Sequence, residues 1–270
     1  MRKAKFPLPR SRRRSDELPW LIFLPGLTAD HRLFANQLSH FSSRANCLVW
    51  DAPGHGLSRP FALDYSLDDL ASMLFSVLER EGIILPILVG QSMGGYLAQA
   101  FLSLYPGYAR GFVSIDSAPL QRAYYHNWEL SALRHTTGMY RAIPWAVLKK
   151  ATAKGCATTE EGRSLMRSML EGYSKREFCL LAGHGYAILS DKIASDTTLP
   201  PTCPTLLLWG ENDEAAACKR LNQEWARATG LSFVEIPNAG HNSNTDAPVE
   251  VNRQIEIFLG QFMRFGKTLR

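Results

Sequence analysis

The amino-acid sequence predicts an α/β fold: a mostly parallel β-sheet covered by helices on both faces, with further helices inserted between two strands. Short apolar runs alternate with amphipathic segments along most of the chain, which is the pattern of successive βαβ units. This alternation stops over residues 119–199, where aromatic residues are frequent and no strand pattern occurs. At residues 90–94 a serine stands between a strand pattern and a helix pattern. The rest of the chain is arranged around that turn.

The serine turn has the sequence Gly90-Gln91-Ser92-Met93-Gly94. Apolar residues over 83–89 predict a buried strand before it, and helical spacing of apolar residues over 96–104 predicts a helix after it. A strand that reverses so abruptly exposes the side chain at its apex, and it needs glycine two positions to either side because larger side chains would collide. The turn therefore predicts an exposed, reactive Ser92. A tight turn without chemistry is the alternative.

Further apolar runs predict the other strands, at residues 20–24, 47–50, 111–116, 205–209 and 231–236. Amphipathic spacing predicts helices over 31–41, from Ser66 to the residue before Gly82, and from Pro248 to about residue 262. We expect residues 18–118 and 200–270 to form the core and residues 119–199 to form a helical cap over Ser92. Residues 1–17 stand apart as a basic leader.

The net charge of +5 belongs to that leader. Residues 1–17 hold seven basic and two acidic residues, and the remaining chain holds 23 of each. We therefore expect a solvated, disordered leader on a neutral body, and no nucleic-acid partner. No apolar run is long enough to span a membrane, and no apolar segment of a secretory signal follows the leader.

The five cysteines are scattered and form no Cys-x-x-Cys pair, which is typical of reduced thiols in a cytoplasmic protein. The histidines at positions 31, 40, 126 and 135 show no metal-ligand spacing, and His55 is expected to brace its glycine-rich turn. His184 is expected to pack within the cap. The sequence thus indicates neither a metal nor a cofactor, and it does not indicate the oligomeric state.

Ser92, Asp213 and His241 each follow a predicted strand, in the order nucleophile, acid and base. A serine hydroxyl needs a base to remove its proton, and histidine suits that role because its pKa lies near neutrality. A carboxylate then orients the imidazole and stabilises its protonated form. Asp116 also ends a strand and is the rival acid; we prefer Asp213 because it lies in a Gly-x-x-Asp context.

With these residues, the chain resembles the α/β-hydrolase superfamily over nearly all of its length after the leader. The matching segments are Leu24-Pro-Gly-Leu27, Asp51-Ala-Pro-Gly-His-Gly-Leu-Ser58, Gly90-Gln-Ser-Met-Gly94, Gly210-Glu-Asn-Asp213 and Gly240-His241. The resemblance implies that Ser92, Asp213 and His241 are catalytic and that the backbone N–H groups of Leu27 and Met93 form an oxyanion hole.

Two departures from the superfamily pattern affect the expected structure. Pro25 occupies a position where members usually have histidine, so the loop before Leu27 should differ while the Leu27 N–H group remains able to donate. The residues before Trp20 are too few for the usual first hairpin, so we expect a sheet truncated at its N-terminal side.

The activity that this resemblance implies is that of a cofactor-independent serine hydrolase acting on a small to medium, largely neutral ester or thioester. A C–C bond hydrolase or lyase with the same three residues is the alternative, and a slow-turnover ligand receptor is a third. Substrate choice should depend on aromatic residues of the cap, for which we name Tyr124, Trp128 and Trp145.

Overall fold

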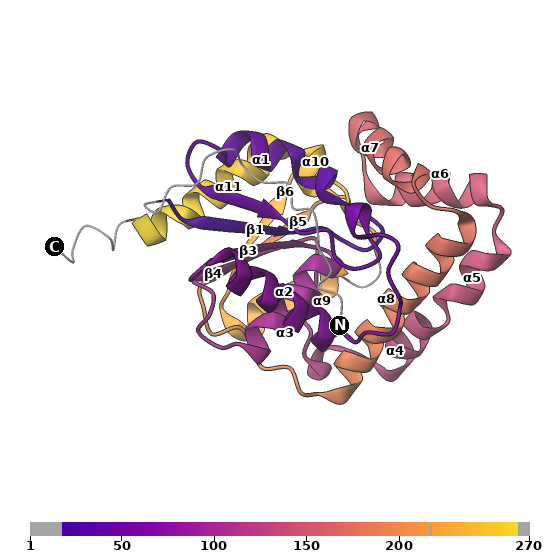
Figure 1. Cartoon of the computed structure of the whole chain (residues 1–270), viewed down its shortest axis with the longest axis horizontal. Coiled ribbons are helices and arrows are strands. Elements are labelled where there is room, and N and C mark those ends of the chain that lie inside the picture. The colour runs from indigo at the N-terminus through magenta and orange to yellow at the C-terminus, as the bar shows by residue number, and fades with distance from the viewer. Residues whose placement is uncertain (1–17, 216–217, 264–270) are drawn as a thin grey trace.

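The structure of the chain is a computed structural model that describes residues 18–215 and 218–263 (Figure 1). The basic leader expected at residues 1–17 lies outside these ranges. Within them, the chain forms one β-sheet with helices on both faces and a group of helices beyond one end of the strands (Figure 1). The predicted α/β class is therefore confirmed.

The sheet of the described residues has six strands, all parallel, in the order β2-β1-β3-β4-β5-β6. The strands are β1 (Trp20–Leu24), β2 (Asn46–Val49), β3 (Ile87–Gln91), β4 (Gly111–Ile115), β5 (Thr205–Gly210) and β6 (Ser232–Ile236). The order of the strands reverses at β1 and β3, and ligands bind at such a reversal, outside the carboxyl ends of the strands. The truncation expected before β1 falls mainly on residues 1–17, which lie outside the described ranges, so it stays a prediction.

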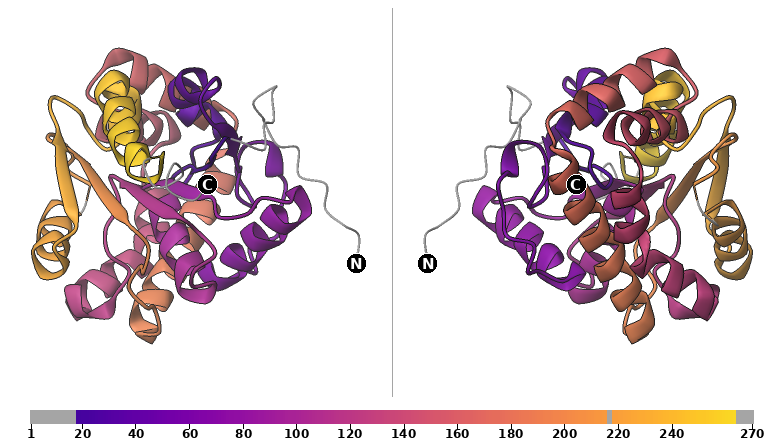
Figure 2. Two further views of the ribbon diagram at one scale, coloured as in Figure 1. Left: turned by 90° about the vertical axis from the view of Figure 1, so that its left-hand side faces the viewer. Right: turned by 90° about the vertical axis from the view of Figure 1, so that its right-hand side faces the viewer.

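Each face of the sheet is covered by its own helices (Figures 1 and 2). The helices of the first face are α2 (Leu67–Glu81), α3 (Met93–Leu104) and α9 (Cys218–Thr229), whose buried side chains meet Ile22, Leu88 and Trp209 of the sheet. On the other face lie α1 (Ala35–Phe41), α10 (Ser243–Asp246) and α11 (Pro248–Met263). Side chains of α1 and α11 meet Phe23, Val89 and Val113 there. Apolar residues on both faces explain why the central strands read as continuous apolar runs.

The strand before the serine is shorter than its apolar run suggests. Helix α2 begins with a capping box between Ser66 and Asp69 and ends at Gly82, which adopts the left-handed conformation at φ 62°. The chain then turns, and Ile84 and Leu85 are 77% and 48% exposed. Strand β3 starts only after Pro86, so part of the apolar run is a connecting turn.

The residues between β4 and β5 form helices and no strand. They contain α4 (Asn127–Arg134), α5 (Thr136–Ala142), α6 (Trp145–Cys156), α7 (Glu160–Glu171) and α8 (Lys175–Ser195), which we call the helical insertion. Helix α8 packs against α4 and α5, and α6 packs against α7. Lys192 of α8 joins the insertion to the core through an ion pair of 2.9 Å with Asp68 of α2.

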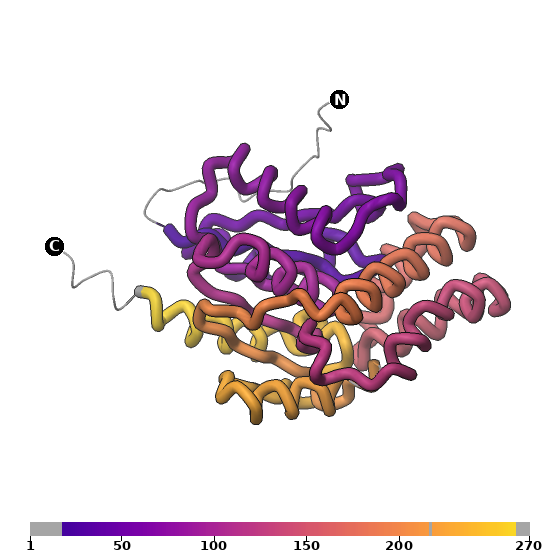
Figure 3. The backbone as a smooth tube through the Cα atoms, turned by 90° about the horizontal axis from the view of Figure 1, so that it is seen from below, coloured from indigo at the N-terminus to yellow at the C-terminus, as the bar shows by residue number. Residues whose placement is uncertain are grey.

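The helical insertion lies beyond the carboxyl ends of the strands, as the direction of the arrows in Figure 1 and the view from below in Figure 3 show. Ligand sites of parallel sheets form at this end, so the insertion stands where it can cover one. Among the described residues, no helix is both long enough and apolar enough to cross a bilayer.

Candidate active site

Ser92 lies at the apex of the turn between β3 and α3, where the sequence placed it. Its backbone has φ 51° and ψ −119°, a conformation that is strained for a residue with a side chain. A Cβ atom on Gly94 would lie 1.9 Å from the Leu24 carbonyl oxygen, and one on Gly90 would lie 2.4 Å from the Gly94 carbonyl oxygen. The two glycines therefore permit the turn because nothing larger fits.

The structure brings Asp213 and His241 to this serine. Asp213 follows β5 and His241 follows β6, so neighbouring strand ends position both. The distance from His241 Nε2 to Ser92 Oγ is 2.9 Å, and the distance from His241 Nδ1 to Asp213 Oδ2 is also 2.9 Å. The other carboxylate oxygen of Asp213 accepts the N–H of Ala215 at 2.7 Å. Both acceptor oxygens of this buried carboxylate are thus occupied.

The pKa of His241 is raised above the ordinary value of 6.5. Burial of the ring acts most strongly and lowers the pKa, because it disfavours the imidazolium. The charge of Asp213, its hydrogen bond to the ring and the charge of Asp116 act in the opposite direction and outweigh burial. This environment stabilises a positive charge on the ring, which a base must carry after it takes a proton.

Asp116, the rival acid, does not contact the imidazole. One of its carboxylate oxygens accepts the N–H of Gly210 and the other accepts the N–H of Ser243, both at 2.8 Å. Burial, together with the nearby charge of Asp213, raises the pKa of Asp116. Asp116 thus connects the end of β4 to the end of β5 and to the segment after His241. Sequence reasoning did not find this role, because a strand-end aspartate looks the same in either position.

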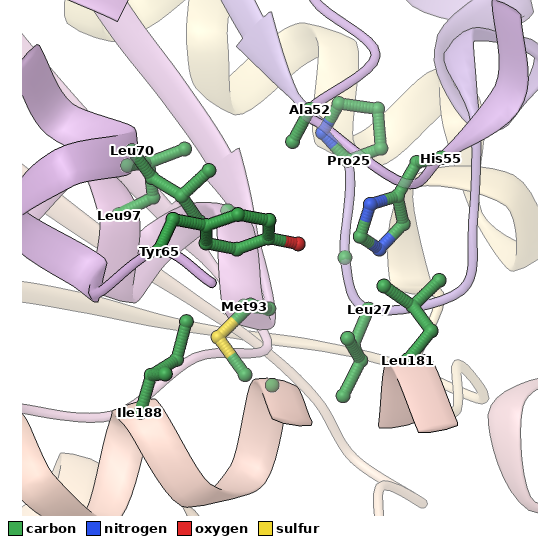
Figure 4. A pocket seen from close by; sticks show the side chains of 13 residues that line it. Pro25, Leu27, Ala52, His55, Tyr65, Leu70, Met93, Leu97, Leu181 and Ile188 are labelled. Carbon is green, nitrogen blue, oxygen red and sulfur yellow. The ribbon is translucent and has the colours of Figure 1, made fainter. Parts of the chain in front are cut away.

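The backbone N–H groups of Leu27 and Met93 have no acceptor among the described residues. Met93 is the first residue of α3, so its N–H lies at the positive end of a helix dipole. Pro25 lacks a backbone N–H, but Leu27 keeps its own, as expected from the sequence. The side chains of Leu27 and Met93 point into a small cavity with Leu181 and Ile188 of α8 (Figure 4).

A cavity of about 440 Å³ opens beside Ser92 and His241, within the size range of small-molecule sites. Its other walls come from the loop after β1, from Glu214 and Ala215, and from helices α5 to α8. The residues contributed by the helical insertion are Tyr140, Ile143, Leu148, Ala151, Thr152, Gly155, Cys156, Met166, Phe178, Ala182 and Tyr186. No lysine or arginine of the described chain lines this cavity, and Glu214 is its only carboxylate.

The three aromatic residues expected at the pocket lie elsewhere. Trp128 of α4 is 67% exposed to solvent. Trp145 packs against Phe178 with ring centroids 5.3 Å apart, and Tyr124 lies in a short 3-10 helix, Arg122–Tyr124, before α4. None of the three is among the residues that line the cavity. The aromatic rings at the cavity are Phe178 and a hydrogen-bonded pair, Tyr140 and Tyr186, which the sequence did not single out.

The remaining histidines have structural surroundings. His55 Nδ1 lies 3.1 Å from the Pro53 carbonyl oxygen within its own turn, and the His184 ring packs edge-on against Tyr65. His31 Nδ1 lies 2.8 Å from Asp51 Oδ2. Across residues 18–215 and 218–263, no three His, Cys, Asp or Glu side chains are grouped so that they could hold a metal ion.

Comparisons with known proteins agree with this geometry. Residues 21–254 match the model of the "Alpha/beta hydrolase family". The chain is similar to a "2-(acetamidomethylene)succinate hydrolase" of Mesorhizobium japonicum, with 23% identity over 260 residues that cover 89% of this chain and 88% of the relative.

Two solved structures have the same fold. One is a thermophilic esterase from Thermogutta terrifontis, with a TM-score of 0.78 and 20% identity, covering 94% of this chain and 93% of that one. The other is an enol-lactonase from Burkholderia xenovorans LB400, with a TM-score of 0.73 and 21% identity, covering 94% and 95% of the two chains. The family match spans most of the chain, and it confirms the resemblance found in the sequence. The protein belongs to the alpha/beta hydrolase family.

Proposed function

We propose that this protein is a cofactor-independent serine hydrolase that cleaves a small to medium, uncharged carboxylic ester or thioester. The observation that carries the proposal is the continuous hydrogen-bonded chain from Ser92 through His241 to Asp213, with 2.9 Å at each step. The strained backbone of Ser92 presents its hydroxyl to the cavity, and the two unpaired N–H groups beside it provide a second requirement of acyl transfer.

In the proposed mechanism, Ser92 Oγ attacks the carbonyl carbon of the ester while His241 Nε2 takes the hydroxyl proton. The negative oxygen of the tetrahedral intermediate accepts hydrogen bonds from the N–H groups of Leu27 and Met93. His241 then gives its proton to the departing alcohol or thiol, which leaves an acyl group on Ser92. Water, deprotonated by His241, attacks that acyl group, and the acid is released as the proton returns to Ser92.

The electrostatics of the cavity support an uncharged acyl group. A substrate carboxylate would need a cationic partner in this partly enclosed site, and no lysine or arginine of the described chain lines it. Glu214 would repel such an anion. The relative from Mesorhizobium japonicum is named for a succinate, which is a dicarboxylate, so we propose that this chain differs from that relative in substrate. The Tyr140 and Tyr186 hydroxyls could instead hydrogen-bond one uncharged oxygen of the substrate.

The test combines covalent labelling with a substrate panel. A fluorophosphonate probe should label the wild-type protein at Ser92 and should not label Ser92→Ala. p-Nitrophenyl esters from acetyl to dodecanoyl should show a graded dependence of kcat/KM on acyl-chain length. Each should be compared with an ester whose acyl chain ends in a carboxylate, and this anionic ester should be turned over poorly.

Labelling without turnover of any ester would contradict the hydrolase proposal and would direct attention to C–C bond cleavage or elimination by the same residues. Equal labelling of Ser92→Ala would show that the nucleophile is another residue. Turnover of the carboxylate-bearing ester at the rate of its neutral counterpart would contradict the substrate class alone.

A further inference from the structure

Helices α5 and α6 of the helical insertion expose positively charged and apolar side chains. No aspartate or glutamate occurs from residue 130 to residue 159, a stretch that contains most of α4 and all of α5 and α6. Met139 of α5 and Val147 of α6 are 53% and 55% exposed. Arg141, Lys150 and Lys154 are exposed on the same two helices. We call these five residues the α5–α6 face. Met139 and Arg141 are two positions apart and project to different sides of α5, so the aligned part of the face lies on α6.

The spacing along α6 places its members on one side of the helix. Val147, Lys150 and Lys154 follow one another at intervals of three and four residues, so they project in similar directions. Leu148 and Ala153, on the opposite side, are buried. Helix α6 therefore packs one side against the protein and presents to solvent a side with cations around an apolar residue.

The positive charges of the α5–α6 face are not neutralised within the described structure. Arg141, Lys150 and Lys154 form no ion pair with any residue of 18–215 or 218–263, although many other exposed cations there do. Arg134, which lies nearby on α4, is paired with Asp191 and is left out of the face for that reason. Glu160, the first acidic residue after the stretch, is itself paired with Arg167.

The α5–α6 face also borders the entrance to the cavity of Ser92. Ala151 and Gly155 are exposed residues of α6, next in sequence to Lys150 and Lys154, and both line the cavity. The two helices lie at the end of the molecule farthest along the strand direction, to the right in Figure 1. A planar partner could therefore rest on this end without meeting the sheet.

We propose that the α5–α6 face binds the surface of an anionic lipid bilayer and holds the cavity entrance against it. Lysine and arginine near such a surface are attracted by about 1 kcal/mol each, and Val147, on the same side of α6 as Lys150 and Lys154, would enter the boundary between headgroups and acyl chains. An uncharged ester could then enter the cavity from the lipid. Binding itself needs no hydrolysis, so its failure would leave the proposed function intact.

The experiment is co-flotation of the full chain with vesicles of phosphatidylcholine alone or with about 30% phosphatidylglycerol, at ionic strength of about 0.1 M. We expect binding to the anionic vesicles, release at about 1 M salt, and little binding to the neutral ones. The Lys150→Glu/Lys154→Glu variant should bind at least about 10-fold more weakly, and Val147→Asp should also bind more weakly. None of Val147, Lys150 and Lys154 lines the cavity, so both surface variants should turn over p-nitrophenyl acetate normally. Because vesicle binding needs no hydrolysis, Ser92→Ala should bind the vesicles like wild type.

The matched control is Arg110→Glu/Arg227→Glu, which changes the net charge equally. Arg110 precedes β4 and Arg227 lies near the end of α9, so both exposed cations are at the amino ends of the strands, opposite the insertion. This control should bind the vesicles within about 2-fold of wild type. An equal loss in both double variants, or no binding to anionic vesicles, would overturn the proposal. Full vesicle binding by Val147→Asp, with heparin binding lost in Lys150→Glu/Lys154→Glu, would identify a soluble polyanion as the partner and would also overturn it.

Discussion

The side chain of Gln91 donates a hydrogen bond of 2.6 Å to the backbone carbonyl oxygen of His241. The same Nε2 atom lies 3.2 Å from Asn242 Oδ1, and the Gln91 side chain is buried. Gln91, the residue before Ser92 in the chain, therefore holds the backbone of His241. This contact fixes the distance between β3 and the loop after β6 at the point where Ser92 meets His241.

Replacing Gln91 with methionine should reduce kcat about 10-fold, because the imidazole loses its backbone anchor. Gln91 also lines the cavity, but methionine has a similar volume, so KM should change little. The matched control is Gln99→Met. Gln99 is equally buried and donates to the Ala118 carbonyl at 2.8 Å, but it does not contact His241. Both variants should lose about 1–3 kcal/mol of unfolding free energy. An equal loss of kcat in the two variants would contradict a positioning role for Gln91.

Asp213→Asn and Asp116→Asn should separate the two carboxylates by function. Asp213→Asn should lower kcat by about 10³- to 10⁴-fold with the fold intact, because the amide no longer stabilises the imidazolium. Asp116→Asn should retain most of its kcat but lose about 1–3 kcal/mol of stability, since an amide nitrogen would then face the N–H of Gly210 or Ser243. Ester kinetics and denaturant unfolding measure the two effects. The reverse pattern would assign the catalytic acid to Asp116.

The pH dependence of kcat/KM should follow the protonation of His241. The ring must be neutral to accept the Ser92 proton, so activity is present above its pKa and is lost as the pH falls through it. Because that pKa is raised, the midpoint of the acidic limb should lie above 6.5. In Asp213→Asn the residual activity should show a midpoint at lower pH, since the attraction that raises the pKa is gone. A wild-type midpoint below 6.5 would contradict this account.

Narrowing the cavity entrance should shorten the preferred acyl chain. Ala151 is exposed and lines the cavity, so Ala151→Trp should exclude the ends of long acyl groups and leave acetyl esters nearly unaffected. Each methylene kept out of the cavity removes about 0.8 kcal/mol, or about 4-fold in kcat/KM. Ala146→Trp is the control, because Ala146 is exposed on the same helix but does not line the cavity. Trp128→Ala should also leave chain-length preference unchanged, whereas a shift there would show that α4 reaches the substrate.

Local constraints explain what the sequence could predict. At the serine turn, a Cβ on Gly90 would collide with the Gly94 carbonyl only four residues away, which is a local constraint that the sequence pattern records. A Cβ on Gly94 would instead collide with the Leu24 carbonyl of the neighbouring strand. Likewise, the parallel sheet follows from apolar runs that end in glycine-rich loops. The ends of parallel strands meet at one edge, and this is why Asp213 and His241 could be expected to lie beside Ser92 before any coordinates.

The cavity wall could not be predicted in the same way. Aromatic composition shows that rings are present over residues 119–199, but it does not show which side of each helix packs against the core. Trp128 points to solvent, whereas Tyr140 and Tyr186, from α5 and α8, meet at the cavity. Their pairing depends on how two helices cross, and neither helix has a strong sequence signal for that crossing. The role of Asp116 could not be predicted for a similar reason, since it depends on loop geometry rather than on residue type.

The position of the helical insertion also affects how readily the segment between β4 and β5 can change in evolution. The insertion joins two adjacent strands, and about 90 residues separate the end of β4 from the start of β5. Loop-closure entropy grows only with the logarithm of length, so replacing a connection of about 6 residues by one of about 90 costs the β4–β5 pairing about 2.4 kcal/mol. A chain with the same strands can therefore exchange, lengthen or rebuild this segment by recombination while Ser92, on the N-terminal side, and Asp213 and His241, on the C-terminal side, continue to meet.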